Sequence, residues 1–231
     1  MSRPDPLVAR VYEQLDAAYH GETWHWSPHY VRGPMDVIAG AVLVQHTTWR
    51  NAERALERLH EAGALNPERL AAIDEERLRD LVRVSGTPSV KARRLRAVAH
   101  TIVEAGGLAA FLALPDAELR ARLLATHGVG RETADAIALY AAERRVFVVD
   151  AYTKRLFSRI GVRPPADSYD AWQRLLEEAM PAADATLFQR FHAWIVLHCK
   201  SICRPAPRCE SCVLRASCAF ARDHSGAPSS R

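Results

Sequence analysis

A glycine turn between two predicted helices is the feature that most constrains the fold of this chain. Residues 127–150 read HGVGRETADAIALYAAERRVFVVD, and the segment leading into them, LRARLLATH, is typical of a helix. Gly128 and Gly130 permit dihedral angles that other residues avoid, so the chain can reverse direction here. The backbone N–H groups at the start of the second helix would then favour an anion such as a phosphate. A GxG turn alone, however, is more typical of an ordinary connection between helices.

The second helix of this pair has one apolar face and is followed by an apolar run. The face consists of residues at positions i, i+3, i+4 and i+7, namely Ala134, Ile137, Ala138 and Ala141. We expect Arg131, Glu132 and Asp135 to point away from it. The run VFVV (146–149) could be a strand, but it has no partner strand, so we predict a buried extended connector. Asp150 follows directly and is predicted to cap a helix, with backbone N–H groups keeping it ionised.

Helical spacing recurs along the chain, without convincing hairpin strands or the glycine pattern of a dinucleotide site. Predicted helices include residues 7–19, 36–45, 51–63 and 67–73, the last with Pro67 in its first turn. Loops containing glycine and proline separate them. The sequence therefore predicts an all-α protein, whose 231 residues suffice for one domain or two small ones.

The basic residues are unevenly placed, although the net charge of +4 is modest. Residues 83–96 contain five basic residues and no acidic one, and residues 199–222 contain five against Glu210 alone. Such segments suit a polyanion, but solvated faces of ordinary helices would look the same. The only three lysines among the 31 basic residues are Lys91, Lys154 and Lys200. Few side chains could therefore serve as an amine nucleophile, because arginine stays protonated.

Four of the five cysteines form a compact cluster near the C-terminus. Cys203, Cys209, Cys212 and Cys218 have the spacing C-x5-C-x2-C-x5-C, and Cys199 is the spare fifth. No apolar run reaches the length of a membrane span and the N-terminus lacks a signal-peptide core, so we expect a cytoplasmic protein without disulfides. Structural zinc sites usually separate two close pairs by a longer segment, whereas only Cys209 and Cys212 form such a pair. An iron–sulfur cluster accepts four thiolates from one loop and is favoured, with zinc as the alternative.

Three segments resemble the endonuclease III superfamily of DNA glycosylases, which carry a helix-hairpin-helix followed by a GPD element. HGVGRETA (127–134) resembles the hairpin, and VVDAYTKRL (148–156) resembles the segment with the catalytic aspartate. AGAVLVQHTTWRNAERAL (39–56) resembles the early helix that carries a glutamine into the DNA. The cysteine tail is also similar, so the resemblance extends from about Trp24 to Cys218.

The resemblance implies a fold and a partner. The fold would be all-α, with a six-helix barrel domain over residues 34–144. Residues 1–33 and 145–231 would form a second helical domain with a 4Fe-4S cluster loop, and the substrate cleft would lie between the domains. The implied partner is double-stranded DNA containing a damaged base. We expect a monomer that is associated with the nucleoid and has no membrane partner.

The resemblance also implies an active site. Asp150 stands at the catalytic aspartate, where a fixed carboxylate would stabilise the positive charge that builds on the sugar as the base departs. Glu132 stands where bifunctional members, which also cut the strand, carry the lysine of GVGRKTA. A carboxylate cannot form a Schiff base, so a monofunctional glycosylase is expected. The alternatives are a glycosylase/lyase and a non-catalytic damaged-DNA-binding protein, in which Asp150 would be a helix cap only.

Further residues take their expected roles from the resemblance. Those expected to contact DNA are Gln45, His127, Gly128, Val129, Gly130, Thr133, Arg204 and Arg208. Those expected to hold the 4Fe-4S cluster are Cys203, Cys209, Cys212 and Cys218, although the first gap is one residue shorter than the commonest family spacing. Thr87 and Pro88 occupy a place where relatives often have a bulkier apolar wedge, which weakens the expectation of insertion there.

Two tryptophans bear on the substrate. Trp24 and Trp26 resemble the pocket of 3-methyladenine glycosylases of the endonuclease III type. Indole rings stack on a cationic alkylpurine and attract it, so an alkylated purine is the favoured substrate and an oxidised pyrimidine the second. The same tryptophans would equally serve to dock the N-terminal helix.

Overall fold

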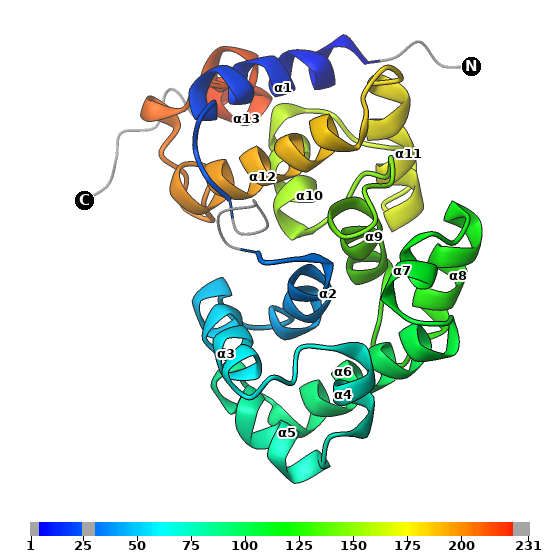
Figure 1. Ribbon diagram of the computed structural model, residues 1–231. Coiled ribbons are helices and arrows are strands. Elements are labelled where there is room, and N and C mark those ends of the chain that lie inside the picture. Colours follow the sequence, from blue (N-terminus) through cyan, green and yellow to red (C-terminus); the bar gives the residue numbers. More distant parts are fainter. Residues whose placement is uncertain (1–4, 25–30, 224–231) are drawn as a thin grey trace. The chain divides into compact units, whose positions relative to one another are not determined.

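The computed structural model describes residues 5–24 and 31–223, and all regular structure in these ranges is helical (Figure 1). The predicted all-α class is confirmed. Trp26, expected in a substrate pocket, lies outside the described residues. No helix in the described ranges has the length and apolar character needed to cross a membrane.

One compact unit, called the hairpin unit, covers residues 25–144. Its helices are α2 (Pro34–Leu43), α3 (Trp49–Glu61), α4 (Pro67–Ala72), α5 (Glu75–Val82), η1 (Arg83–Ser85), α6 (Pro88–Glu104), α7 (Leu108–Leu112), α8 (Asp116–Ala125) and α9 (Arg131–Tyr140). Helix α2 is the centre of this unit, because every residue from Met35 to Leu43 is buried and the helix contacts α3, α6 and α9. A helix that is apolar on all sides belongs in a core. Gln45 follows it directly and so emerges from the middle of the unit.

Short polar side chains fix where several of these helices begin. Thr48, Asn66 and Asp74 each accept a hydrogen bond from the backbone N–H three residues later, at the starts of α3, α4 and α5. This contact satisfies one of the N–H groups that the first turn of a helix leaves without a partner. Helix α9 differs, because it begins at Gly130, which has no side chain to cap it. Its first turn therefore keeps the feature that predicted an anion site.

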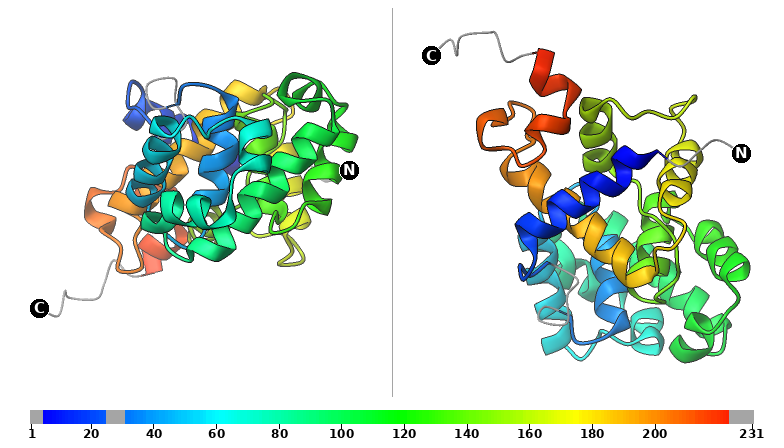
Figure 2. Two further views of the ribbon diagram at one scale, coloured as in Figure 1. Left: turned by 60° about the horizontal axis from the view of Figure 1, so that its bottom comes forward. Right: turned by 90° about the horizontal axis from the view of Figure 1, so that it is seen from above.

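The other compact unit, called the aspartate unit, combines residues 1–24 and 145–231. Its helices are α1 (Pro6–Tyr19), α10 (Ala151–Ile160), α11 (Tyr169–Ala179), α12 (Ala185–Ser201), η2 (Cys209–Ser211), η3 (Arg215–Ser217) and α13 (Ala219–Asp223). Helix α12 contacts both α1 and α10, and the right-hand view of Figure 2 shows α1 crossing over α12. The ring of Phe191 packs edge to face against Tyr12 of α1 and Phe157 of α10, with centroids 5.2 and 6.1 Å apart. Aromatic contacts thus join the two ends of the sequence in one core.

The segment before Asp150 is extended and buried, as predicted. Phe147, Val148 and Val149 have no more than 2% of their surface exposed. Among the residues that the structure describes, no strand lies beside the backbone of this connector, and side chains of α11 provide its hydrogen bonds instead. The N–H of Phe147 donates to Glu177 and its carbonyl accepts from Gln173, both at 2.8 Å. A buried backbone needs such partners, so α11 holds the chain extended up to Asp150.

The apolar face of α9 is buried as expected, and Asp135, which points away from that face, is buried as well. Asp135 is fully buried, and its Oδ1 accepts a hydrogen bond from Nε of Arg120 in α8 at 2.8 Å. Both α2 and α8 contact α9, so more than one side of this helix is covered. A buried carboxylate requires a charged partner, and Arg120 provides one from a helix that the local pattern does not reveal.

Candidate functional site

Asp150 caps α10 and lies beside a histidine. Its Oδ1 accepts a hydrogen bond from the backbone N–H of Thr153 at 2.7 Å, the contact predicted for an N-cap. Its Oδ2 lies 3.6 Å from Nε2 of His192 in α12. The two side chains are 11% and 9% exposed, so the carboxylate is nearly enclosed but still reaches the surface. Sequence reasoning missed His192, whose only signal is a lone histidine in the apolar stretch FHAWIVL.

The surroundings of Asp150 favour its charged form. Burial acts to raise the pKa of this carboxyl, but the hydrogen bond and charge of His192, together with Thr153, outweigh burial and lower the pKa below its ordinary value of 3.8. Asp150 is therefore a carboxylate at neutral pH. A fixed, ionised carboxylate near the surface is the group needed to stabilise a developing positive charge.

The hairpin turn depends on one of its two glycines. Gly128 has a φ of +81°, and a Cβ at this position would collide with the side chain of Arg94. Gly130 has an ordinary φ of −91°, so the expectation that both glycines supply special dihedrals was wrong for Gly130. Val129 is buried and anchors the turn, whereas His127 is exposed. The turn thus presents polar groups on one side and is fastened to the core on the other.

Gln45 lies against this hairpin. Its Nε2 donates to the hydroxyl of Thr133 at 3.0 Å and to the carbonyl of Gly128 at 3.3 Å. Its Oε1 accepts from Nη1 of Arg94, a residue of α6 that sequence reasoning missed. The structure therefore brings together three of the residues expected to contact DNA. In this arrangement Gln45 binds the hairpin, and any insertion into DNA must replace these hydrogen bonds.

Glu132 lies exposed in the first turn of α9, where it complements the helix dipole. Of the three lysines, Lys91 is only 1% exposed and its Nζ donates to two backbone carbonyls. Lys154, one turn beyond Asp150, forms an exposed ion pair with Asp167 at 3.0 Å. Lys200 lies near the end of α12, close to the cysteines in sequence. Position 132 is a glutamate, and none of the three lysines lies in the hairpin.

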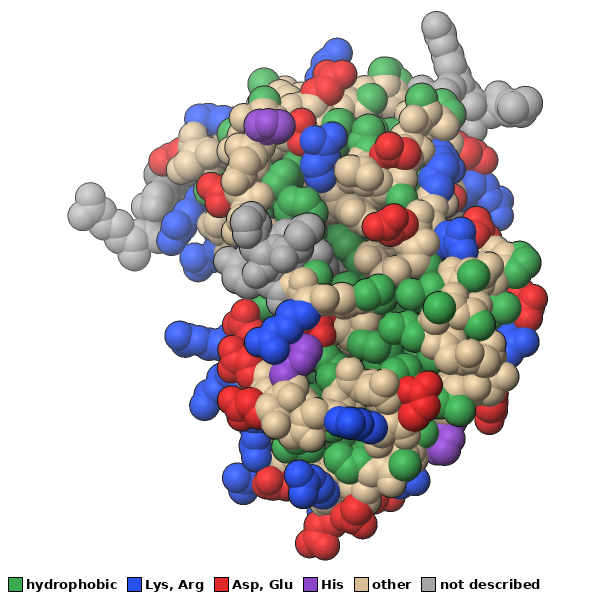
Figure 3. All heavy atoms as spheres, viewed as in Figure 1, with side chains coloured by type: hydrophobic (Ala, Val, Ile, Leu, Met, Phe, Trp, Pro, Cys, Tyr) green, Lys and Arg blue, Asp and Glu red, His purple; other side chains and the backbone are tan. Residues whose placement is uncertain are grey.

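Among the described residues, the basic side chains of segment 83–96 have ion-pair or hydrogen-bond partners. Arg83 lies 3.8 Å from Asp80, and Arg96 lies 3.6 Å from Glu75. Lys91 is buried and Arg94 binds Gln45. Helix α5 thus supplies the acidic partners that the segment itself lacks. On the face shown in Figure 3, basic and acidic side chains are interspersed over the hairpin unit.

The four clustered cysteines line one cavity in the aspartate unit. Apolar side chains, including Leu156, Ile160 and Leu214, form much of the rest of its wall. Four thiols around one largely apolar cavity fit the thiolate ligands that a 4Fe-4S cluster takes. Within residues 5–24 and 31–223, no group of three or more His, Cys, Asp or Glu side chains is arranged to hold a single metal ion. The fit to a cluster rests on the donor set, four cysteines that line one cavity.

Two arginines of α10 hold the loop that carries these cysteines. Arg155 donates from Nε to the carbonyl of Cys203 at 3.0 Å. Arg159 donates to the carbonyls of Arg204 and Pro205 at 2.6 and 2.9 Å, and to the sulfur of Cys203 at 3.3 Å. The side chains of Arg204 and Arg208 are exposed. The loop is thus fixed by one pair of arginines and presents another to solvent.

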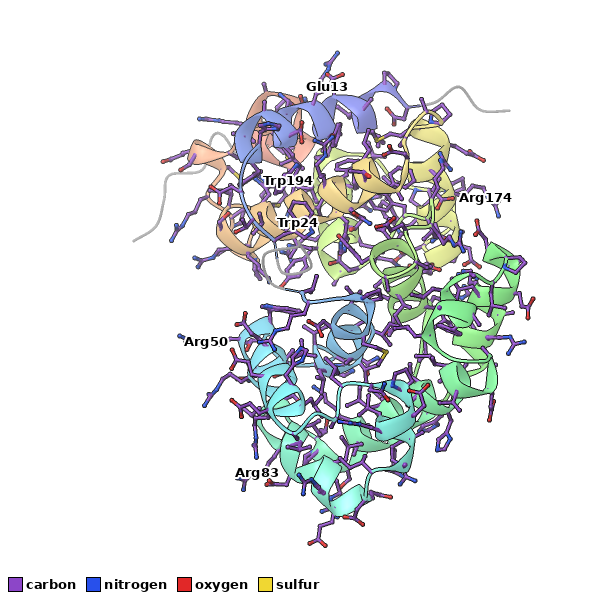
Figure 4. The ribbon with its side chains drawn as sticks, viewed as in Figure 1. Glu13, Trp24, Arg50, Arg83, Arg174 and Trp194 are labelled. Atoms are coloured by element: carbon purple, nitrogen blue, oxygen red, sulfur yellow. The ribbon has the colours of Figure 1, made fainter. Side chains whose placement is uncertain are left out.

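Trp24 packs against α12. Its ring meets Trp194 edge to face, with centroids 5.5 Å apart (Figure 4), and Trp194 in turn stacks on Tyr19. The indole N–H of Trp194 donates to Asp16 at 2.9 Å. This packing is what a tryptophan that docks the end of the N-terminal segment would show. Its own Nε1 is buried without a hydrogen-bond partner in the described part of the chain.

Comparisons with known proteins agree with this arrangement. Residues 39–182 match the family described as HhH-GPD superfamily base excision DNA repair protein. The chain is 40% identical to the Methanocaldococcus jannaschii protein named "Putative DNA repair glycosylase MJ1434", over 92% of this chain and 96% of that one. It is 31% identical to endonuclease III of Thermotoga maritima, over 84% and 86% of the two chains.

A solved structure with the same fold carries a damaged base. It is the 3-methyladenine DNA glycosylase MagIII of H. pylori bound to 1,N6-ethenoadenine, with a TM-score of 0.74 and 26% sequence identity. The match covers 85% of this chain and 97% of that one. The family match and the length of the M. jannaschii alignment both show which family the chain belongs to. The chain belongs to the HhH-GPD superfamily of base excision DNA repair glycosylases.

Proposed function

We propose that this protein removes a damaged base from double-stranded DNA by hydrolysing the N-glycosidic bond, and that it leaves the strand uncut. The observation that carries the proposal is Asp150, which is held as an ionised carboxylate at the start of α10 and close to the surface. As the base departs, positive charge builds on the sugar, and Asp150 stabilises it and assists the attacking water. His192 holds the carboxylate in place and keeps it charged.

The absence of strand cleavage rests on Glu132. A lyase needs an amine that attacks the sugar carbon and forms an imine, and a carboxylate cannot do this. Lys154 is the nearest lysine to Asp150 in sequence, and its ion pair with Asp167 gives it another role. The proposal therefore ends the reaction at an abasic site.

DNA binding is assigned to the hairpin and to the exposed arginines. The uncapped N-terminus of α9, with Gly128, Val129 and Gly130, offers backbone N–H groups to a phosphate, and His127 and Thr133 flank it. Gln45 fills the space left when the damaged nucleotide rotates out of the helix. Arg204 and Arg208, which lie in the loop that carries the cysteines, contact phosphates of the DNA backbone.

We assign a 4Fe-4S cluster to Cys203, Cys209, Cys212 and Cys218, which share one cavity. When bound, the cluster supplies binding energy that fixes the loop, without any redox step in base removal. Arg159 donates a hydrogen bond to the Cys203 sulfur and favours its thiolate form, which such a ligand requires.

We propose an alkylated purine as the substrate. The MagIII complex contains 1,N6-ethenoadenine, and the buried indole N–H of Trp24 has no hydrogen-bond partner among the described residues. An indole ring also attracts a cationic base. An oxidised pyrimidine is the second candidate, favoured by the 31% identity to endonuclease III of Thermotoga maritima.

A panel of duplex oligonucleotides tests the activity. Each duplex carries one alkylated purine, one oxidised pyrimidine or no lesion, and each reaction is analysed with and without hot alkali, which cuts at abasic sites. We expect strand breaks at alkylated purines only after alkali. Asp150→Asn should keep the helix cap and lose at least about 100-fold in base release, the effect of removing one transition-state stabiliser. Wild-type protein that binds damaged duplexes and releases no base would instead be a binding protein.

Borohydride trapping tests the absence of lyase chemistry. Borohydride reduces an imine between protein and DNA to a stable bond, so wild-type protein should give no trapped band on any duplex that it processes. A band in the wild type would contradict the monofunctional assignment. Its loss in Lys154→Gln would then identify Lys154 as the attacking amine.

A further inference from the structure

Lys91 is a buried lysine that the proposed chemistry does not use. It lies on α6 and is 1% exposed. Its Nζ donates to the carbonyl of Leu43, the last residue of α2, and to the carbonyl of Ser85, the last residue of η1, at 2.7 Å for the latter. One side chain therefore joins two chain segments that are far apart in the sequence.

Both joined segments lead directly into strained loops. Two residues after Val44, His46 has a φ of +55°, and Gln45 lies between them. After Ser85, Gly86 has a φ of +78° and Thr87 a φ of +42°. The left-handed region is unfavourable for a β-branched residue such as Thr87, and strain of this kind persists only where the surroundings enforce it.

Burial of Lys91 has no ordinary stabilising explanation. In the described ranges it has no carboxylate partner, and its charge-bearing Nζ is instead satisfied by the two carbonyls. Burial, followed by the charge of Arg94, lowers the pKa of Lys91 to about 8. An apolar side chain would fill the same space without this desolvation cost. The two carbonyl contacts are what a lysine provides here and a methionine does not.

We propose that Lys91 is a positioning residue that sets the spacing of two DNA-entering loops, residues 44–48 with Gln45 and residues 86–88 with Thr87 and Pro88. This inference rests on the proposed function, because it assumes that the protein rotates a base out of duplex DNA. The backbones of the Gln45 loop and of the Thr87–Pro88 corner then approach the DNA helix as one rigid element, and Lys91 keeps them in register. The small Thr87–Pro88 corner acts through its fixed backbone and needs no bulky side chain.

Lys91→Met, which keeps the length of the side chain and removes its donors, tests the role of Lys91. Base release is compared on a lesion in duplex DNA and on the same lesion in a single strand, where no base has to leave a stack. We expect about a tenfold loss on the duplex, the size of effect of a lost buried hydrogen bond. Release from the single strand should stay within about twofold of the wild type. An equal loss on both substrates, or none on either, would show that Lys91 only packs the core.

A fluorescent 2-aminopurine next to the lesion gives a readout independent of chemistry, because its emission rises when it unstacks. Wild-type protein should raise the emission on binding and Lys91→Met should raise it less. Absence of base release by the wild type, with this difference intact, would sink the proposed function and leave the role of Lys91 standing. Absence of any rise with the wild type would overturn the role of Lys91.

A second variant guards against a failure of Lys91→Met to fold. Thr87→Gly removes the strain at the left-handed position and leaves the contacts of Lys91 in place, so it should fold at least as well as the wild type. It frees the corner that Lys91 fixes, and the ratio of duplex to single-strand release should fall. A ratio equal to that of the wild type would exclude the Thr87–Pro88 corner and overturn the proposal.

Discussion

The hairpin (residues 127–133) and the cysteine loop (residues 203–218) are both short segments that contain turns, but they are held by different means. The hairpin turn relies on the left-handed backbone of Gly128 and on close contact with Arg94. The cysteine loop is held by Arg155 and Arg159, which donate to its carbonyl oxygens from a helix more than forty residues earlier in the sequence. The left-handed dihedral angle of Gly128 can be recognised from the sequence of the turn itself. The contacts made by Arg94, Arg155 and Arg159 come from other helices and cannot be recognised in this way.

A substitution in the hairpin is the strongest test of this difference. Gly128→Ala places a Cβ against Arg94 at a φ of +81°, and should lower the free energy of unfolding by about 2 kcal/mol. It should also weaken DNA binding, because Arg94 then moves away from Gln45. Gly130→Ala is the matched control, since its φ is ordinary and nothing lies within 4 Å of the added Cβ. Urea unfolding measures both, and Gly130→Ala should stay within about 0.5 kcal/mol of the wild type.

If the two alanine variants were equally destabilised, the hairpin would need glycine at both positions and not only at the left-handed position 128. Similar stability of both variants, with DNA affinity unchanged, would mean that Arg94 and Gln45 adjust freely. Either result would remove the contrast with the cysteine loop.

A pair of arginine variants tests the cysteine loop. Arg159→Gln removes donors to the carbonyls of Arg204 and Pro205, and should lower the free energy of unfolding by about 1 kcal/mol. Hydrogen exchange of the loop amides should speed up. Arg204→Gln is the control. The side chain of Arg204 is exposed, so its replacement should leave folding unchanged. Its effect should be on DNA, where the slope of log affinity against log salt falls by about 1.

The two variants separate holding the loop from binding DNA. If Arg204→Gln also speeded up amide exchange, the exposed arginine would belong to the scaffold. If Arg159→Gln left exchange unchanged, the loop would be fixed by its cysteines alone.

Local patterns predicted the helices, the extended connector and the capping position of Asp150, because each depends on neighbours in sequence. They did not predict His192, which reaches Asp150 from α12, nor the burial of Asp135, whose partner Arg120 lies on another helix. The acidic partners of the basic segment 83–96 lie on α5 and were not predicted either. The resemblance to a known family supplied the roles of Gln45 and Glu132. It gave no indication of Arg94 or Lys91, whose importance lies in contacts across the fold.

The charge on Asp150 gives the smallest expected effect and the most specific test, because this charge depends on both a local contact and a distant one. The pKa of Asp150 lies below 3.8 in the folded protein. The ionised form therefore stabilises the fold at pH values above the pKa of the unfolded protein. This contribution disappears as the pH falls through the pKa of the folded protein. We compare the free energy of unfolding of the wild type with that of Asp150→Asn. The difference between them should be constant near neutrality and shrink only below about pH 4. The change should be less than about 1.5 kcal/mol, the range of one hydrogen bond. In a His192→Gln background the distant contact is lost while Thr153 still donates, so the same difference should shrink at a higher pH. Thermal unfolding across a pH series measures all four proteins, and an identical pH profile in the two backgrounds would show that the local cap alone sets the charge of Asp150.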